Sequence, residues 1–383
     1  MNGNKTRISL VSTTFHKGPA LSVPDELVDE EHPLLYKPFN HLEYRKVHIE
    51  LGLKKIGYSI EAHCAWEGKR ETMDSPKLPV VDLSGEDLRP GTEIWISTSK
   101  QVCHALEEYG CFLIKSNQVS LDLHNAIYTA ALQDLFNLPK EIKQLIKSSS
   151  EQPYRDVFSS NPNHEGIAMG DIISTSEAIH RFSNLAWPAG NNLFCESVYE
   201  ISKIMMNLDQ TVLRMAFQNY GVDKYYDSQI RSTDYVTGSS KYKESEKNEN
   251  YVGLVIHTDK TFSTIIHQND VNGLEIQTKD GQWILYEPSS HSSFLYLAAD
   301  AFKAWSNGRI HPCCHRVTMS VNKTRFSLGL FTFLKGVTYV PDELIDEEHP
   351  LRYKPFSHRE YHRLFKEHGK KKIQYSIEAL CGV

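Results

Sequence analysis

The stretch YVGLVIHTDKTFSTIIHQ, residues 251–268, holds two runs of β-branched and aromatic residues separated by a polar turn. Runs of this composition and length are typical of β-strands. Five more follow it: GLEIQTK (273–279), QWILYEP (282–288), SSFLYLA (292–298), HRVTMSV (315–321) and RFSLGLFTFL (325–334). Asn, Asp and Gly lie between the runs, and we expect NDVNG (269–273) and KDGQ (279–282) to be hairpin connections. Many short strands at this spacing predict a sandwich or jelly roll.

The chain before about residue 225 shows helical rather than strand periodicity. Segment 98–110 predicts an amphipathic helix that runs into the short strand CFLI (111–114), and 120–146 predicts two helices separated by Pro139. Segment 195–222 predicts a long helix whose Met-rich stripe packs in the core, whereas 148–191 reads as loop-rich. The fold class is therefore α+β, and we expect the charged helix at 357–380 to pack outside the sheet.

Composition and charge narrow the class of protein. Hydrophobic residues make up 40% of the chain and charged residues 23%, which are ordinary values for a globular protein. The net charge of −6 and the scattered basic residues argue against a nucleic-acid partner. No apolar run is long enough to span a membrane and no signal peptide is evident, so we expect no membrane partner and a cytoplasmic location. The seven cysteines form no regular framework and predict free thiols.

The two ends of the chain carry the same tail. VPDELVDEEHPLLYKPF at 23–39 closely matches VPDELIDEEHPLRYKPF at 340–356, and the match runs from Pro24 to Cys64 and from Pro341 to Cys381. Two copies around an unrelated middle are not a solenoid. We interpret 1–72 as an extra, non-catalytic copy fused before a natural start at Met73. Two further regions are expected, a helical one at 76–200 and a catalytic jelly roll at 201–383.

Three residues form a candidate metal site. His257 and Asp259 stand two apart at the end of a predicted strand, so their side chains project from one face. His315 begins a later strand. Two imidazoles and one carboxylate make the facial triad that suits non-haem Fe(II) and leave open positions for other ligands. The HxD pattern alone is weak evidence, because it occurs often by chance.

A second group of residues lies downstream and strengthens the metal interpretation. Arg325 and Ser327 share a strand face, and a guanidinium with a hydroxyl can bind one carboxylate of a diacid. The opposite keto-acid end of such a molecule would then reach the metal. Tyr242 lies upstream of His257, and its hydroxyl can hydrogen-bond the same molecule.

Alternatives exist at several positions. His311 competes with His315 as the distal histidine, but the spacing to Arg325 and the HRV context favour His315. His267 and His291 have no partner at metal-ligand spacing. The adjacent Cys313 and Cys314 can be read as an extra thiolate ligand or redox sensor, although neutral drift is the preferred interpretation.

Several stretches together resemble the plant 2-oxoglutarate- and Fe(II)-dependent dioxygenases, and within them the AOP group, which includes enzymes that modify glucosinolate side chains. They are LPVVDLS, LEEYGCFLI, HTDKTF, VNGLEIQTKDGQWI, DAFKAWSNGRIHPCCHRV, RFSLGLF and DEEHPLRYKPF. The resemblance covers roughly residues 76–383. It implies a double-stranded β-helix core, iron ligands at His257, Asp259 and His315, and co-substrate contacts at Arg325, Ser327 and Tyr242. One departure is TGSS at 237–240, which weakens the strand expected before Tyr242.

The function expected is oxidation of a small plant specialised metabolite, with Fe(II), 2-oxoglutarate and O2 as cofactor and co-substrates and ascorbate as reductant. The outcome can be hydroxylation, desaturation or dealkylation, and a glucosinolate side chain is one candidate. We expect a monomer with a small-molecule substrate. Two other hypotheses remain open at this point. One is a catalytically impaired descendant of such an enzyme, and the other is a zinc hydrolase, which would have no need of Arg325 or Ser327.

Overall fold

The computed structural model describes residues 77–149, 161–170, 172–244, 250–319, 323–370 and 375–383. The chain divides into two units, 1–75 and 76–383. The expected tail copy at 1–72 lies outside the described residues. All that follows concerns the second unit.

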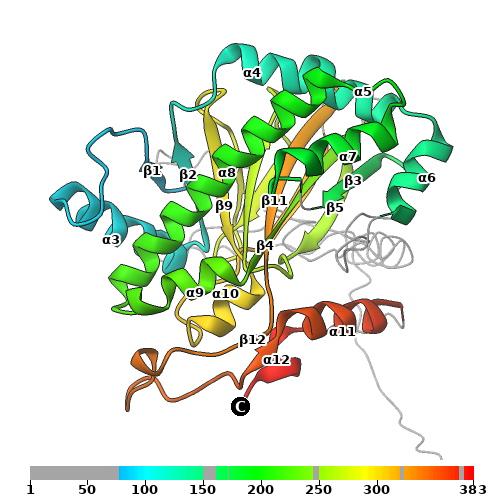
Figure 1. The fold of residues 1–383 in the computed structure, drawn as a ribbon. Coiled ribbons are helices and arrows are strands. Elements are labelled where there is room, and N and C mark those ends of the chain that lie inside the picture. The colour runs from blue at the N-terminus through cyan, green and yellow to red at the C-terminus, as the bar shows by residue number, and fades with distance from the viewer. Residues whose placement is uncertain (1–76, 150–160, 171, 245–249, 320–322, 371–374) are drawn as a thin grey trace, which may run out of the picture. The chain divides into compact units, whose positions relative to one another are not determined.

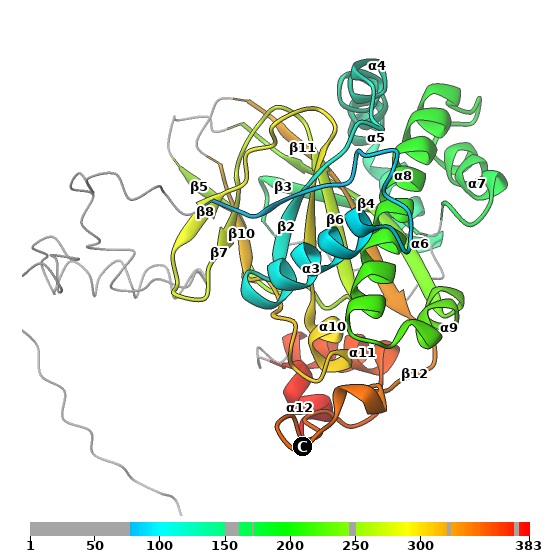
Figure 2. The ribbon, with the colours of Figure 1, turned by 90° about the vertical axis from the view of Figure 1, so that its left-hand side faces the viewer.

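Two β-sheets form the centre of this unit (Figure 2). The larger has seven strands in the order β1 (Val80–Asp82), β2 (Cys111–Lys115), β9 (Ser293–Ala298), β6 (Ser263–Gln268), β11 (Arg325–Leu334), β4 (Thr233–Tyr242) and β3 (His164–Gly170). The smaller has four strands in the order β5 (Tyr251–His257), β10 (His315–Met319), β7 (Leu274–Gln277) and β8 (Trp283–Leu285). Only β1 and β2 pair in parallel among these strands. Buried side chains from both sheets share one cluster, which includes Tyr242, Leu297, Leu274 and Val317. The predicted jelly-roll core in an α+β protein is confirmed.

Helices cover the face of the large sheet that is turned away from the small sheet (Figures 1 and 2). In chain order the N-terminal ones are α3 (Glu93–Glu108), α4 (Leu121–Asn125), the π-helical η2 (Ala126–Ala131), α5 (Leu132–Asn137), α6 (Lys140–Ser149), α7 (Ser176–Ala186), α8 (Asn192–Asn219), the 3-10 turn η3 (Asp223–Tyr225) and α9 (Tyr226–Arg231). As predicted, helix formation breaks at Pro139, between α5 and α6. Segment 76–200 is nevertheless not purely helical, because β1, β2 and β3 join the large sheet.

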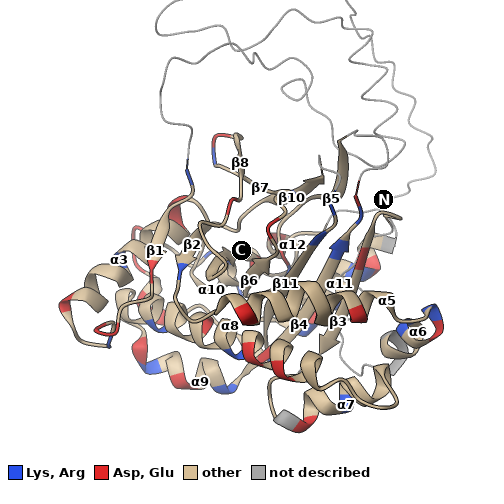
Figure 3. Ribbon diagram, turned by 90° about the horizontal axis from the view of Figure 1, so that it is seen from above, with Lys and Arg blue, Asp and Glu red and all other residues tan. Residues whose placement is uncertain are grey.

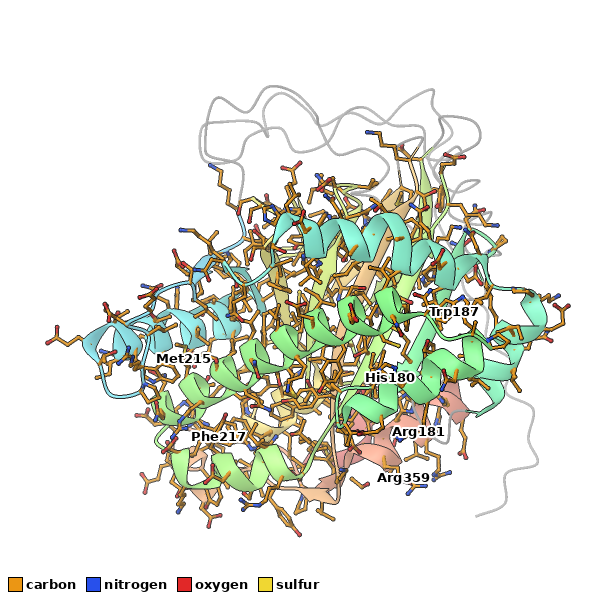
Figure 4. All side chains as sticks on the ribbon, turned by 45° about the horizontal axis from the view of Figure 1, so that its top comes forward. His180, Arg181, Trp187, Met215, Phe217 and Arg359 are labelled. Carbon is orange, nitrogen blue, oxygen red and sulfur yellow. The ribbon has the colours of Figure 1, made fainter. Side chains whose placement is uncertain are left out.

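The long helix α8 is fixed to the sheet by one buried carboxylate. Asn191 caps its first turn by accepting a hydrogen bond from the Phe194 N–H. Asp209 is fully buried and accepts hydrogen bonds from Tyr235 of β4, Ser263 of β6 and Tyr296 of β9. The Met-rich stripe packs in the core as predicted, with the helix residues Met215 and Phe217 fully buried (Figure 4). One helix thus holds three strands in register.

The C-terminal part lies at one end of the sheets. Its elements are α10 (Asp300–Trp305), β12 (Val337–Thr338), the 3-10 turn η4 (Asp342–Leu344), β13 (Phe356–Ser357), α11 (His358–Lys370) and α12 (Ile377–Cys381). Figure 1 shows them below the sheets, where β11 runs into this region. The helix α11 lies outside the two sheets, as expected (Figure 1), and one of its faces also lines the central cavity described below.

Three sequence expectations need correction. Segment 148–191 is not simply loop-rich, since β3 and α7 lie within it. The β3 sequence HEGIAMG is rich in Gly and Ala, and the strand is stabilised by pairing with β4 rather than by its own composition. NDVNG is not a hairpin, because β6 pairs with β9 and β11 while β7 pairs with β10 and β8; the segment crosses between the sheets. The strand with TGSS is intact, as β4 pairs with β11 along its whole length.

The outer surface carries mixed charge. Acidic and basic residues are interspersed along the outer helices in Figure 3. Within the described ranges, no helix combines the length and the apolar character that crossing a membrane requires.

Candidate active site

The sheet pairing brings the three candidate metal ligands together. β5 and β10 are antiparallel neighbours, and their register places His315 directly opposite His257. Asp259 follows two residues after the end of β5. One donor atom of each residue lies within 4.8 Å of the others, and this is the one such group of three found in the described part of the chain. His257 Nε2 lies 3.5 Å and His315 Nε2 3.8 Å from Asp259 Oδ1.

Hydrogen bonds orient all three donors. His257 Nδ1 lies 2.8 Å from the Val255 carbonyl oxygen, and His315 Nδ1 lies 3.1 Å from the Cys313 carbonyl oxygen. Each Nδ1 therefore carries the proton, which leaves each Nε2 lone pair directed at the shared point. Thr264 donates a hydrogen bond of 2.7 Å to Asp259 Oδ2, so that Oδ1 stays available. A preformed set of two imidazoles and one carboxylate can hold Fe(II).

The protonation states agree with this geometry. Burial lowers the pKa of His315 to about 4, and the adjacent His257 adds to this effect, so the imidazole is neutral at neutral pH. Burial alone would raise the pKa of Asp259. The neighbouring imidazoles of His315 and His257 and the Thr264 hydroxyl outweigh it and hold that pKa below its ordinary value.

The other histidines and the cysteine pair are outside this cluster. His267 is buried, with Nδ1 2.8 Å from the Tyr128 hydroxyl and Nε2 2.9 Å from the His291 carbonyl oxygen. Burial raises the pKa values of Cys313 and Cys314, so both thiols stay protonated. His311 is not a member of the cluster of three donors.

A cavity of about 390 Å³ connects the metal donors with the predicted anion-binding residues. Its lining includes His257, Asp259 and His315 together with Arg325, Ser327 and Tyr242. Its size lies within the range usual for small-molecule sites, ~300–1,000 Å³. The six residues selected from sequence spacing are therefore brought into one cavity.

Arg325 is a buried cation. It is 1% exposed, and among the described side chains no carboxylate lies within ion-pair distance of it. Its Nη2 donates a hydrogen bond of 2.7 Å to Gln268 Oε1, its guanidinium lies 5.1 Å from the centre of the Tyr242 ring, and its Nε has no hydrogen-bond partner. An unpaired buried charge is costly, so this site fits an anionic ligand.

Tyr286 adds a second polar atom without a partner. Its side chain is fully buried beside Tyr242 and Leu274, and its hydroxyl has no hydrogen-bond partner among the described residues. Burial raises the pKa of Tyr286, and the positive charge of Arg325 opposes that rise. The Tyr286 hydroxyl is therefore a buried donor within the electrostatic influence of Arg325.

Tyr242 has two close neighbours. Its ring stacks on His164 of β3, with centroids 4.4 Å apart and an interplanar angle of 3°, and Gly253 of β5 approaches its Cδ1 and Cε1 atoms. A Cβ at Gly253 would lie 2.7 Å from Tyr242 Cδ1, closer than real contacts allow. Only glycine fits this position without moving the ring.

Comparison with known proteins identifies the family. Residues 217–333 match the model of the 2OG-Fe(II) oxygenase superfamily, and residues 78–180 match that of the N-terminal region of non-haem dioxygenases in morphine synthesis. A probable 2-oxoglutarate-dependent dioxygenase of Arabidopsis thaliana, AOP1, is 35% identical over 314 residues, covering 80% of this chain and 96% of the relative. The chain belongs to the 2-oxoglutarate–Fe(II) oxygenase superfamily. It is an iron- and 2-oxoglutarate-dependent dioxygenase.

More distant relatives agree with this family assignment. The Arabidopsis dioxygenase AOP3 is 27% identical over 408 residues, covering 81% of this chain and 98% of the relative. The crystal structure of the rice dioxygenase for auxin oxidation has a TM-score of 0.66 at 24% identity, covering 80% of this chain and all of the rice chain, and shows the shared fold. The zinc-hydrolase alternative is not supported.

Sequence reasoning missed several residues of this dioxygenase site. Thr264, Gln268 and Tyr286 have no spacing signature relative to the HxD or RxS motifs. His164 lies in the segment read as loop. The lining residues of α11 lie in a helix whose charged sequence suggested a solvent-facing position.

Proposed function

We propose that His257, Asp259 and His315 hold the iron and that Arg325, Ser327 and Tyr242 bind 2-oxoglutarate. One observation supports this most: the metal-donor triad and an unpaired buried guanidinium line the same cavity. The separation in role follows from chemistry, since neutral nitrogen and carboxylate donors suit Fe(II) and a guanidinium suits a carboxylate.

Each group of protein residues has its own task. Fe(II) and 2-oxoglutarate, when bound, supply the chemistry by which O2 oxidises a substrate carbon. His257 and His315 present preoriented Nε2 lone pairs, and Thr264 keeps Asp259 in position. Arg325 and Ser327 fix one carboxylate of the diacid, which directs its other end toward the triad. Phenylalanine side chains at the cavity wall exclude water; they are Phe331, Phe333 and Phe365.

The substrate in this proposal is a small plant specialised metabolite, and the outcome is hydroxylation, desaturation or dealkylation. The support comes from a largely apolar cavity wall and from relatives of the AOP group. A glucosinolate side chain is one candidate. We further propose that the enzyme is a cytoplasmic monomer without nucleic-acid or membrane partners. In this proposal the catalytic domain is 201–383 and follows an N-terminal region at 76–200. Residues 1–72 take no part in catalysis.

The test uses the full chain with Fe(II), ascorbate and 2-oxoglutarate, and measures succinate. Calorimetry of 2-oxoglutarate with Mn(II)-loaded protein gives an independent readout. We expect metal-dependent binding that Asp259→Ala abolishes and that deletion of residues 1–72 leaves unchanged. Binding that is unaffected by removal of the metal or by Asp259→Ala contradicts the assignment. A relative described as a probable inactive AOP2 is 27% identical, so succinate formation also tests for impaired activity.

A further inference from the structure

The chain crosses from one sheet to the other beside Arg325. The crossover is residues 269–273, which lead from the end of β6 to β7 (Figure 2). Gln268, the last residue of β6, lies directly opposite Ser327 in the pairing of β6 with β11. Gln268 is 3% exposed and does not appear among the described residues that line the cavity. Its influence on a ligand in the cavity therefore acts through its neighbours on β11.

The crossover holds Arg325 by its backbone and along its stem. The Asn269 side chain accepts a hydrogen bond of 3.0 Å from the Phe326 N–H and donates one of 3.1 Å to the Thr324 carbonyl oxygen. These two residues flank Arg325 on β11. At the other end of the crossover, a Cβ at Gly273 would lie 3.5 Å from Arg325 Cδ, so the chain passes close to the stem of the arginine.

Gln268 holds the head of the same side chain. Arg325 Nη2 donates a hydrogen bond of 2.7 Å to Gln268 Oε1. Because a guanidinium has only donors, the amide must present its oxygen to it. The amide nitrogen lies 3.3 Å from both the Val271 carbonyl oxygen and Asn272 Oδ1, and Asn272 Nδ2 donates to Glu287 Oε1 at 3.2 Å. The crossover thus supplies the acceptors that fix the amide in this orientation.

Gln268 directs the guanidinium without neutralising it. A carboxylate at this position would form an internal ion pair with Arg325, and a ligand would have to displace that pair. An amide oxygen forms one hydrogen bond and leaves the positive charge to be balanced by a ligand. The neutral partner therefore combines a fixed position with affinity for an anion.

We propose that Gln268 is the positioning residue of Arg325, and that the crossover thereby selects the 2-oxo diacid by its length. This rests on the proposed function, in which Arg325 binds one end of the co-substrate and the metal donors meet the other. A guanidinium held by backbone, stem and head stands at a set distance from the metal donors. A diacid of the length of 2-oxoglutarate spans that distance, whereas a longer one must bend or push the guanidinium aside.

The experiment uses the full chain loaded with Mn(II) under exclusion of O2, and calorimetry measures the affinity for three ligands. They are 2-oxoglutarate, the longer 2-oxoadipate, and pyruvate, which has the keto-acid end but no second carboxylate. Gln268→Met keeps the length of the side chain and removes the amide. Gln268→Glu keeps its shape and adds a negative charge.

Gln277→Glu is the matched control, because it makes the same change at a residue that does not contact Arg325. Gln277 lies on the outer face of β7, between buried neighbours that face inward, and its side chain bonds the Gly281 carbonyl oxygen. Asn272→Ala is a milder variant at a half-buried position, and it removes one of the acceptors that orient Gln268. Thermal unfolding shows that each variant is folded.

The wild-type protein should bind 2-oxoglutarate about tenfold or more tightly than 2-oxoadipate. Gln268→Met should reduce this preference roughly 2- to 10-fold, because a guanidinium that is not held can follow the longer acid and each ligand has to order it. Gln268→Glu should weaken binding of both diacids roughly 10- to 100-fold, since an ion pair must be displaced. Pyruvate affinity should stay the same in all variants, and Gln277→Glu should match the wild type.

Equal affinity of the wild-type protein for the two diacids overturns the selection by length. An unchanged preference in Gln268→Met together with unchanged 2-oxoglutarate affinity in Gln268→Glu overturns the positioning role. A purely structural Gln268 would lower thermal stability and weaken pyruvate and both diacids alike, which also contradicts the proposal. If neither Gln268 variant folds, Asn272→Ala decides: it should lower the preference for 2-oxoglutarate about twofold, and an unchanged preference overturns the proposal.

These outcomes are distinct from failure of the proposed function. That function fails if the wild-type protein shows no metal-dependent binding of 2-oxoglutarate. The role of Gln268 fails in a wild-type protein that binds 2-oxoglutarate but whose variants at this position bind the diacids as the wild type does.

Discussion

Replacing Arg325 with methionine separates a ligand-binding role from a structural one. Methionine keeps a long apolar stem in the same space but removes the guanidinium. A structural arginine stabilises the unliganded protein through its own partners, whereas a ligand-binding arginine is costly until the ligand arrives. The contacts of Arg325 point to the second case, because Gln268 is neutral and Nε has no partner.

The magnitude follows from burial. Removing one member of a buried, hydrogen-bonded charge pair costs about 2–5 kcal/mol, which corresponds to 2-oxoglutarate binding roughly 30- to 4,000-fold weaker. For the unliganded protein the sign is opposite. Burial lowers the pKa of Arg325, so its charge is disfavoured unless an anion binds beside it. The free energy of unfolding of the Arg325→Met protein without 2-oxoglutarate should therefore equal or exceed that of the wild type.

Calorimetry with Mn(II)-loaded protein measures the affinity for 2-oxoglutarate, and urea unfolding of the unliganded protein measures the free energy of unfolding. Arg316→Met is the matched control in the opposite sheet. Arg316 forms an ion pair with Glu275 at 2.8 Å, and its guanidinium lies 3.8 Å from the centre of the Trp283 ring. Its loss should cost about 1 kcal/mol of stability and leave 2-oxoglutarate affinity unchanged.

Either of two results refutes this reasoning. The first is Arg325→Met protein that binds 2-oxoglutarate as tightly as the wild type. The second is a loss of several kcal/mol in the stability of the unliganded variant, which would make Arg325 a structural residue.

Three further predictions concern neighbouring groups. Tyr286→Phe should weaken 2-oxoglutarate binding roughly 2- to 10-fold without lowering stability, since it removes a hydroxyl that has no hydrogen-bond partner among the described residues; unchanged affinity in calorimetry argues against a role of this hydroxyl in binding. Gly253→Ala should displace Tyr242, cost about 1–3 kcal/mol of stability and weaken 2-oxoglutarate binding. Urea unfolding measures the first effect and calorimetry the second. A variant with wild-type stability and affinity would show that the Tyr242 ring moves freely. Burial lowers the pKa values of His267 and His358 to about 4, below the ordinary value of about 6.5, so the unfolded chain binds more protons between these two pH values. The free energy of unfolding should therefore fall as pH drops from about 6.5 to 4, by up to about 3 kcal/mol per histidine, and His358→Gln should reduce this slope in urea titrations; a flat profile contradicts the prediction.

The parts of the site that the sequence predicts are those whose chemistry depends on spacing along a strand. His257 and Asp259 stand two apart, as do Arg325 and Ser327, and strand geometry alone places each pair on one face. That His315 lies opposite His257 required one further inference, that a later strand pairs beside the first. Residue type and spacing carry this information before any fold is known.

Other parts depend on which strands become neighbours, and local sequence does not encode that. β3 is a strand because β4 pairs with it, and NDVNG is a crossover because β7 joins the other sheet. Tyr286 joins the buried cluster around Tyr242 only through the arrangement of both sheets. Similarly, the polar sequence of α11 is compatible with solvent exposure until the cavity beneath it is known.

The helix α11 is attached by hydrogen bonds from His358 to the Lys260 carbonyl oxygen and from Tyr361 to Asp300, and this has a consequence for how this enzyme is made. All three metal donors and Arg325 precede α11 in the chain, so the cavity wall that α11 provides is synthesised after them. A chain interrupted before His358 would therefore carry every metal donor but lack this wall and the bonds that attach it. Metal binding and an enclosed cavity can thus be separated by the loss of one helix.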